Sequence, residues 1–175
     1  QRARAVQALS QLDCPEVHDA LRNALNDRDR EVQLIAALAL AALEDGPTLD
    51  ELTGKLSLTD GSISLLTKSL LRRIAANKPE QVKEFALRPN QNAEVCLSAL
   101  EALAANGDYS IVPLVGDAAL ELPEAAPELS RYLDMLAALA HPAAKPAVLR
   151  CMTSPSAEIR QAAAKAAGAI RLMES

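Results

Sequence analysis

Hydrophobic residues recur along this chain at intervals of three or four positions, with polar residues between them. This spacing places apolar side chains on one face of an α-helix, whereas a strand would need a sustained interval of two. Alanine is frequent in these stripes, and it both favours helix and lets a neighbouring helix approach closely. The four clearest stripes are Val32, Ala36, Ala39, Leu40 and Leu43; Val95, Ala99, Ala102 and Leu103; Leu129, Leu133, Leu136 and Leu139; and Ile159, Ala162, Ala163, Ala166 and Ile170.

A second set of amphipathic helices is predicted between these stripes. Its apolar faces are Val17, Leu21 and Leu25; Leu49, Leu52 and Leu56; and Val112, Val115, Ala119 and Leu122. One pair of such helices cannot bury all of its apolar surface, so neighbouring pairs must stack. The pattern therefore predicts an all-α protein in which antiparallel helix pairs follow one another.

Polar residues that can start a helix mark the beginning of each pair. They recur at steps of 32, 32, 31 and 33 residues, at Asp13, Asp45, Asn77, Asp108 and His141. Asp and Asn side chains accept a hydrogen bond from a free backbone N–H in the first turn, and His141 is the weakest of the five markers. Pro15, Pro47 and Pro79 are expected in first turns, where a missing N–H costs nothing. An internal period of this length is typical of stacked-repeat proteins.

The period predicts a single domain of about 11 helices. It consists of a half pair, residues 1–12, and the pairs 13–44, 45–76, 77–107, 108–140 and 141–175. The predicted fold is a right-handed α-solenoid of antiparallel pairs of about 32 residues. Residues 1–12 look like a second helix without its first helix, and the sequence lacks an initiator Met. We therefore expect a fragment of a longer chain.

Composition and charge limit the kind of core this protein can have and the partners it can bind. Half of the residues are hydrophobic, yet only Phe85, Tyr109 and Tyr132 are aromatic, which favours many small helix contacts over one large core. The net charge of −5 disfavours nucleic acid as a partner, because phosphates are neutralised by Lys and Arg. A local basic strip, Lys68, Arg72 and Arg73, could still contact a polyanion, and a solvated helix face is the explanation that we favour. The apolar run Leu34 to Leu43 is far shorter than the roughly 18 residues of a membrane span, so no direct membrane insertion is expected.

The three cysteines lie far apart, at Cys14, Cys96 and Cys151. An odd, sparse set fits free thiols in a reducing compartment, and one disulfide with one free thiol is the alternative. Cys96 is expected to be a small core residue. A cytoplasmic location follows as an expectation, and the oligomeric state stays open.

Residues for catalysis or metal binding do not form a known pattern. His18 and His141 lie in different repeats, and no two cysteines have metal-ligand spacing. The glycines are isolated, which argues against a phosphate loop, and no Gly-x-Ser-x-Gly motif occurs. The acidic clusters stand at helix starts, where the helix dipole favours them. No catalytic residue, metal ligand or cofactor is therefore predicted.

Two segments carry a resemblance to a known family. One runs from Asp27 to Leu40, and the other runs from Ser154 to Gly168. Both resemble the HEAT repeat, of the bacterial type related to phycobilisome-lyase-like repeats. Gly107 and Asp108, followed by the segment Ile111–Leu114, are similar to the start of the first helix in that family.

The resemblance implies several functions. Proteins that share this fold include interaction scaffolds, chromophore lyases, an iron-dependent hydroxylase and alkylpurine DNA glycosylases. The hydroxylase-like members carry His–Glu pairs that this sequence lacks, and the glycosylase-like members are basic and rich in aromatic residues. We therefore expect a noncatalytic scaffold that binds a protein or peptide. The alternatives are an accessory subunit or lyase-like module for an enzyme that handles a cofactor or chromophore, and an enzyme whose active site lies outside this sequence.

In similar solenoids the second helix of each pair lines a concave binding face. We assign to this face the positions one, five and nine residues after the first large apolar residue of each second helix, which is Val32, Ile63, Val95, Leu129 or Ile159. The predicted partner-binding residues are Gln33, Ala37, Ser64, Lys68, Arg72, Leu100, Ser130, Asp134, Arg160 and Ala164, and the same positions include Ala41, Cys96, Ala104, Ala138 and Gly168. Their small, weakly charged side chains suit a helix or an extended peptide. A solvated or inter-pair face is the alternative. Leu34 and Leu38 form an extra apolar edge, which we attribute to packing against a neighbouring pair, with a docking patch as the alternative.

Overall fold

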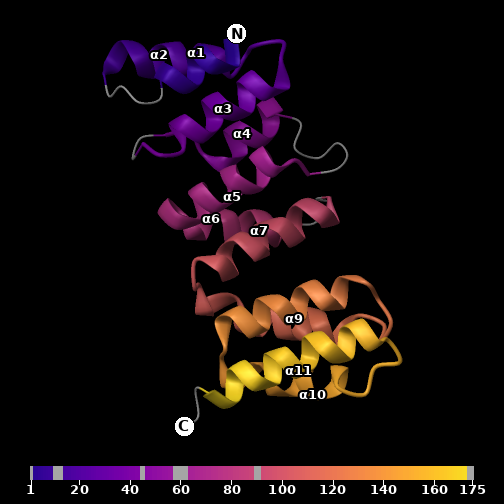
Figure 1. Ribbon diagram of the computed structural model, residues 1–175. Helices are drawn as coiled ribbons and strands as arrows, with labels where there is room; N and C mark the ends of the chain where they lie inside the picture. Colours follow the sequence, from indigo (N-terminus) through magenta and orange to yellow (C-terminus); the bar gives the residue numbers. More distant parts are fainter. Residues whose placement is uncertain (1, 10–13, 44–45, 57–62, 89–91, 173–175) are drawn as a thin grey trace. The chain divides into compact units, whose positions relative to one another are not determined.

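The computed structural model describes residues 2–9, 14–43, 46–56, 63–88 and 92–172, with only the backbone described for 53–56. Clustering of contacts divides the chain into two compact units, residues 1–102 and residues 103–175. Each unit is built from helices, and no strand occurs in the described ranges (Figure 1). The all-α prediction is confirmed.

Unit 1 contains one unpaired helix followed by helix pairs. The helices are α1 (Arg2–Leu9), α2 (Pro15–Ala24), α3 (Arg30–Leu40), α4 (Leu49–Leu56), α5 (Leu65–Asn77), α6 (Pro79–Ala86) and most of α7 (Ala93–Ala105). The second helices α1, α3 and α5 pack in sequence, since α3 contacts both α1 and α5. The first helices α4 and α6 also pack together.

Unit 2 contains two further pairs, each opened by a short 3-10 helix. Its elements are η1 (Tyr109–Ile111), α8 (Val112–Glu121), α9 (Glu128–Leu139), η2 (Pro142–Ala144), α10 (Lys145–Cys151) and α11 (Ala157–Leu172). α9 and α11 lie side by side, and α8 packs against α10 (Figure 1). The described part of the chain thus holds 11 α-helices, the predicted number. The prediction of a single domain stays a prediction.

The helix starts agree with the sequence markers only in part. Asp108 Oδ1 accepts a hydrogen bond from the Ser110 N–H at 3.0 Å, and His141 Nδ1 accepts one from the Ala143 N–H at 3.2 Å. Pro15 and Pro79 begin α2 and α6, as expected. Asp13 and Asp45 lie outside the described residues.

Asn77 was wrongly predicted to cap a helix start. It is the last residue of α5, and its side-chain amide donates to the Ala41 carbonyl at 2.9 Å. Lys78 takes the cap position of α6 without a side-chain hydrogen bond.

The start of α4 also differs from the prediction. Pro47 precedes this helix, and Thr48 and Glu51 exchange hydrogen bonds, of 3.3 Å from the Glu51 N–H and 3.0 Å from the Thr48 N–H. This reciprocal capping box satisfies two backbone donors that the first turn leaves without helical partners.

The cores of the two units have the same composition. Fully buried side chains are Leu, Ile, Val and Ala together with Phe85, and they include Leu40, Leu52, Leu70, Leu71 and Val82 in unit 1 and Ile111, Leu129, Leu133, Leu136, Ala163 and Ala166 in unit 2. Burying one such large side chain contributes about 1.5–3 kcal/mol. The alanines allow α11 to lie close to α9.

Polar side chains from one pair hold the turns of the preceding pair. In unit 1, Lys78 Nζ donates to the Gly46 carbonyl at 3.0 Å. In unit 2, Arg150 donates to the Ala119 and Leu122 carbonyls, both at 2.8 Å, and Ser154 Oγ donates to the Glu124 carbonyl at 2.6 Å. The Ala119 carbonyl lies in the last turn of α8, where no helical partner is available, and the Leu122, Glu124 and Gly46 carbonyls lie between helices.

Candidate functional site

The predicted partner-binding residues do not share one environment. Ala37 and Leu100 are 0% and 5% exposed, so their assignment to a binding face was wrong. Their side chains pack inside the protein, where a partner cannot reach them. Ala41 and Ala104, from the same register, are also buried.

Four polar members of the set bond to backbone at the start of their own helix. Gln33 Nε2 donates to the Asp27 carbonyl at 2.7 Å, and Ser64 Oγ accepts from the Thr67 N–H at 3.1 Å. Ser130 Oγ donates to the Pro127 carbonyl at 3.0 Å, and Arg160 donates to the Ser154 carbonyl at 2.8 Å. These bonds order the turn before each helix, a structural role that follows from the position in the first turn.

The other four members reach the surface. Arg72 and Ala164 are exposed and Lys68 is half-buried. Asp134 is exposed and pairs with Lys165 of α11, with Oδ1 and Nζ 2.7 Å apart. Partner binding at these residues stays a prediction.

A groove of about 430 Å³ lies on α1, α3 and α5 in unit 1. We call it the B groove; it is lined by Gln7, Glu31, Ile35, Leu38, Ala39, Ala42, Leu66 and Arg73. Ile35, Leu38 and Leu66 are half-buried, so part of each side chain faces solvent. The lining is mixed: five of the eight residues are apolar, and polar and apolar atoms contribute about equally to its exposed surface.

The B groove lies on a different face of α3 from the predicted strip. Successive residues of an α-helix are rotated by about 100°, so the groove positions Ile35, Leu38 and Ala42 lie on average roughly 130° around the helix from Gln33, Ala37 and Ala41. The sequence signal for this face was the apolar pair Ile35 and Leu38, outside the main stripe. Leu34 packs inside as expected, at 3% exposure, whereas Leu38 lines the groove.

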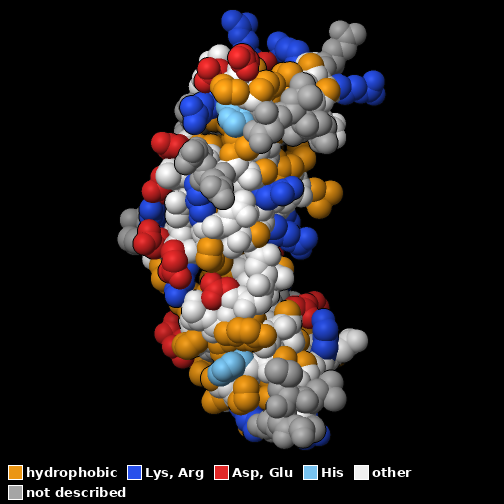
Figure 2. Space-filling view, turned by 90° about the vertical axis from the view of Figure 1, so that its left-hand side faces the viewer, with side chains coloured by type: hydrophobic (Ala, Val, Ile, Leu, Met, Phe, Trp, Pro, Cys, Tyr) orange, Lys and Arg blue, Asp and Glu red, His pale blue; other side chains and the backbone are white. Residues whose placement is uncertain are grey.

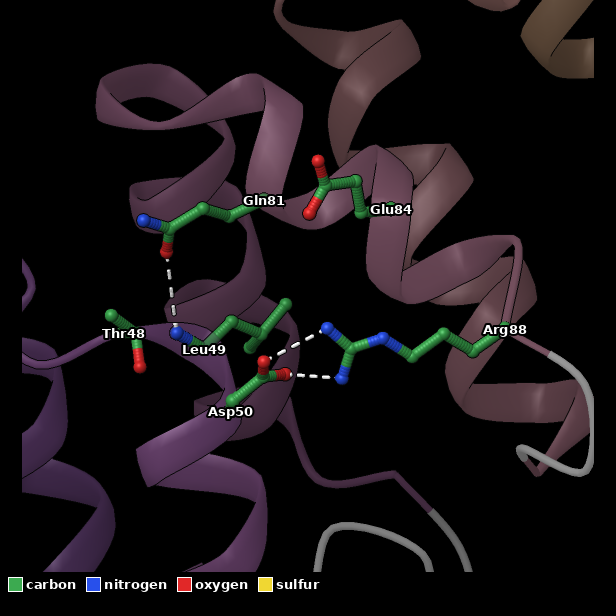
Figure 3. Close-up of a pocket in the computed structure, with 6 residues that line it drawn as sticks. All are labelled: Thr48, Leu49, Asp50, Gln81, Glu84 and Arg88. Atoms are coloured by element: carbon green, nitrogen blue, oxygen red, sulfur yellow. Dashed lines mark hydrogen bonds and ion pairs between the residues drawn. The ribbon is translucent and has the colours of Figure 1, made fainter.

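A smaller, polar pocket of about 210 Å³ lies between α4 and α6 (Figure 3). Asp50 and the Arg88 guanidinium form a two-pronged ion pair across it, and the Gln81 side-chain oxygen accepts from the Leu49 N–H at 3.4 Å. The Arg88 hydrogen bonds lower the pKa of the Asp50 carboxyl, and Asp50 raises the pKa of Arg88. The ion pair between Asp50 and Arg88 therefore links two neighbouring helix pairs.

A third pocket, of about 240 Å³, lies between α10 and α11 in unit 2. Val148, Leu149, Ala167 and Ile170 line it together with Lys145 and Arg171, and Leu149 is 65% exposed. Leu149 is one of the most exposed large hydrophobic side chains in the described chain.

Surface charge is mixed. Figure 2 shows acidic, basic and hydrophobic side chains interspersed over one face of the chain. In the described ranges, no group of three or more His, Cys, Asp or Glu side chains could hold a metal ion. None of the described helices is both long and apolar enough to cross a membrane.

The cysteines that the structure describes are free thiols. Cys151 is buried, and Cys96 is half-buried where a core position was expected. Burial raises the pKa of both thiols, because it disfavours the charged thiolate.

Comparison with protein families agrees with the helical pairs. The family described as HEAT repeats matches residues 1–84, and the HEAT repeat family matches residues 145–170. The chain belongs to the HEAT-repeat proteins, which are built from repeated helix pairs. No curated protein matches the chain. The bacterial origin and the likeness to phycobilisome lyases stay predictions.

Proposed function

We propose that this protein is a noncatalytic scaffold that binds another protein through the B groove of unit 1. HEAT repeats commonly mediate protein interactions, and the groove adds a concave surface on three successive second helices, with exposed parts of Ile35, Leu38 and Leu66 in its lining. Burying apolar surface contributes roughly 25 cal/mol per Å², so a partner that covers Ile35, Leu38 and Leu66 gains binding energy there. The half-buried Leu38, in the middle of the groove, carries the proposal.

A photo-crosslinking amino acid placed at Leu38 tests this function in the native cell. We expect a discrete crosslinked protein from this position and none from Arg22, an exposed residue of α2 outside the groove. Absence of a crosslink at Leu38, or the same product from Arg22, would contradict the proposal.

Surface variants separate the B groove from the predicted strip. Leu38→Asp introduces a charge into the groove and should reduce crosslinking from a probe at Ala39 by at least about tenfold, which corresponds to about 1.4 kcal/mol. Lys68→Glu with Arg72→Glu reverses charge on the predicted strip and should leave that crosslink unchanged. If Lys68→Glu with Arg72→Glu reduced the crosslink and Leu38→Asp did not, the result would support partner binding at the predicted strip.

The accessory-subunit or lyase-like alternative, like the cytoplasmic location, stays a prediction from the sequence. No feature of the described residues favours it over the scaffold.

A further inference from the structure

We infer that the partner segment in the B groove is an amphipathic α-helix with a basic residue near one end and an acidic residue near the other. This inference rests on the proposed function and specifies the partner of the same site. Three observations carry it: the apolar side chains at the centre of the lining, the direction of the two helices, and two opposite charges at different levels along the groove.

The apolar lining favours a helix over an extended peptide. Ile35, Leu38 and Leu66 offer no hydrogen-bonding side chains, and the interior backbone groups of α3 and α5 are already paired within their helices. An extended segment would bury backbone N–H and C=O groups without partners, which is costly. A helix satisfies those groups internally and presents side chains at intervals of three and four.

The groove has a defined direction because α3 and α5 run the same way. Asn77, the last residue of α5, donates to the carbonyl of Ala41, the residue that ends α3. The carboxyl ends of the two helices are therefore adjacent. Glu31 stands in the first turn of α3, whereas Arg73 lies one turn before the end of α5.

Opposite charges therefore lie at different levels along the groove. Counted back from the adjacent helix ends, Glu31 lies ten residues before Ala41 and Arg73 lies four residues before Asn77, so about six residues, roughly 9 Å at 1.5 Å per residue, separate them along the helices. Both side chains are exposed, and neither charged group has an ion-pair partner among the residues that the structure describes. Binding is favoured when potentials across an interface are complementary.

The charges also set the direction of the partner helix. A helix is stabilised by acidic residues in its first turn and basic residues in its last turn. A partner with that arrangement places its acidic end at Arg73 and its basic end at Glu31. It therefore lies antiparallel to α3.

The test uses two synthetic helical peptides of about 14 residues, roughly 21 Å long. Both carry leucines at helical spacing. The matched peptide has Glu in its first turn and Lys in its last turn, and the reversed peptide exchanges these residues. Binding to the complete 175-residue chain is measured by fluorescence anisotropy at low and high salt.

We expect the matched peptide to bind about tenfold more tightly than the reversed peptide at low salt, with a smaller ratio at high salt. The double variant Glu31→Lys, Arg73→Glu should invert this preference. Leu38→Asp should abolish binding of the matched peptide, while Leu87→Asp, at an exposed leucine outside the groove, should not.

Equal binding of the two peptides, no binding of either, or a preference that the double variant fails to invert would overturn the inference. A third peptide, with two central prolines that prevent helix formation, should not bind. The photo-crosslink at Leu38 is independent of these peptides. A crosslink with failed peptides would leave the proposed function standing, whereas absence of the crosslink would reject the function itself.

Discussion

The second helices α3 and α11 belong to different units and use the same helical position in opposite ways. Six residues after its first apolar residue, α3 carries Leu38, which lines the B groove. At the same position, α11 carries Lys165, which pairs with Asp134 of α9. Both helices bury the first and fifth positions of this register, Val32 and Ala36 in α3 and Ile159 and Ala163 in α11, while the chemistry of the outer face differs. Stacking is therefore a shared property of the repeats, and the proposed binding surface belongs to one region.

The largest expected effect tests whether the interiors of the two units are equivalent. Leu70→Ala in unit 1 and Leu133→Ala in unit 2 each truncate a side chain that is 0% exposed. Each should lower the free energy of unfolding by about 2–5 kcal/mol, because transfer energy is lost and a cavity is left. Urea denaturation followed by circular dichroism measures this. A loss below about 1 kcal/mol in one unit only would show that its core is loosely packed.

The next effect compares the polar links between pairs. Arg150→Ala in unit 2 leaves the carbonyls of Ala119 and Leu122 without their donor and should cost about 1–3 kcal/mol. Lys78→Ala in unit 1 removes one bond and should cost less. Arg150→Lys is the control that keeps the charge but loses the fork of two donors. Equal stability of Arg150→Ala and the wild type would contradict a stabilising role for this link.

A smaller effect distinguishes two equivalent turns within unit 2. Gly107 precedes the cap Asp108 with a φ of 73°, and Ala140 precedes the cap His141 with a φ of 49°. Only glycine adopts this left-handed region without strain. Ala140→Gly should stabilise the protein by roughly 0.5–1 kcal/mol, and Gly107→Ala should destabilise it by a similar amount. Thermal denaturation of the two variants should therefore show shifts of opposite sign.

The smallest effect on stability comes from exchanging the outer-face residues themselves. Leu38→Lys and Lys165→Leu should each change the free energy of unfolding by less than about 1 kcal/mol, since the sites are partly or largely exposed. Leu38→Lys should nevertheless abolish the crosslink in the B groove. If it destabilised the fold as much as a core variant, Leu38 would be a packing residue and the contrast with α11 would fail.

Much of the fold could be predicted because helical spacing is local. The intervals of three and four residues identified each helix, and the recurrence of polar residues identified the pairs. The start of α4 was missed because Thr48 and Glu51 cap each other, while the period directed attention to Asp45. The candidate site was predicted less well. The proposed groove lies on second helices, as the predicted strip does, but on a different face of α3, where Ala37 and Ala41 of the strip are buried.

The sequence by itself determined that this chain folds into stacked helix pairs, and it located most of their boundaries. Only the tertiary structure decided which apolar residues remain accessible. Leu34 and Leu38 are the same residue type one helical turn apart, yet one is buried and the other lines a groove. In the tertiary structure the Asn77 side chain likewise donates to the Ala41 carbonyl and does not cap the start of the next helix. The physical reason is that burial of a helix face depends on side chains from pairs about 32 residues away in the sequence.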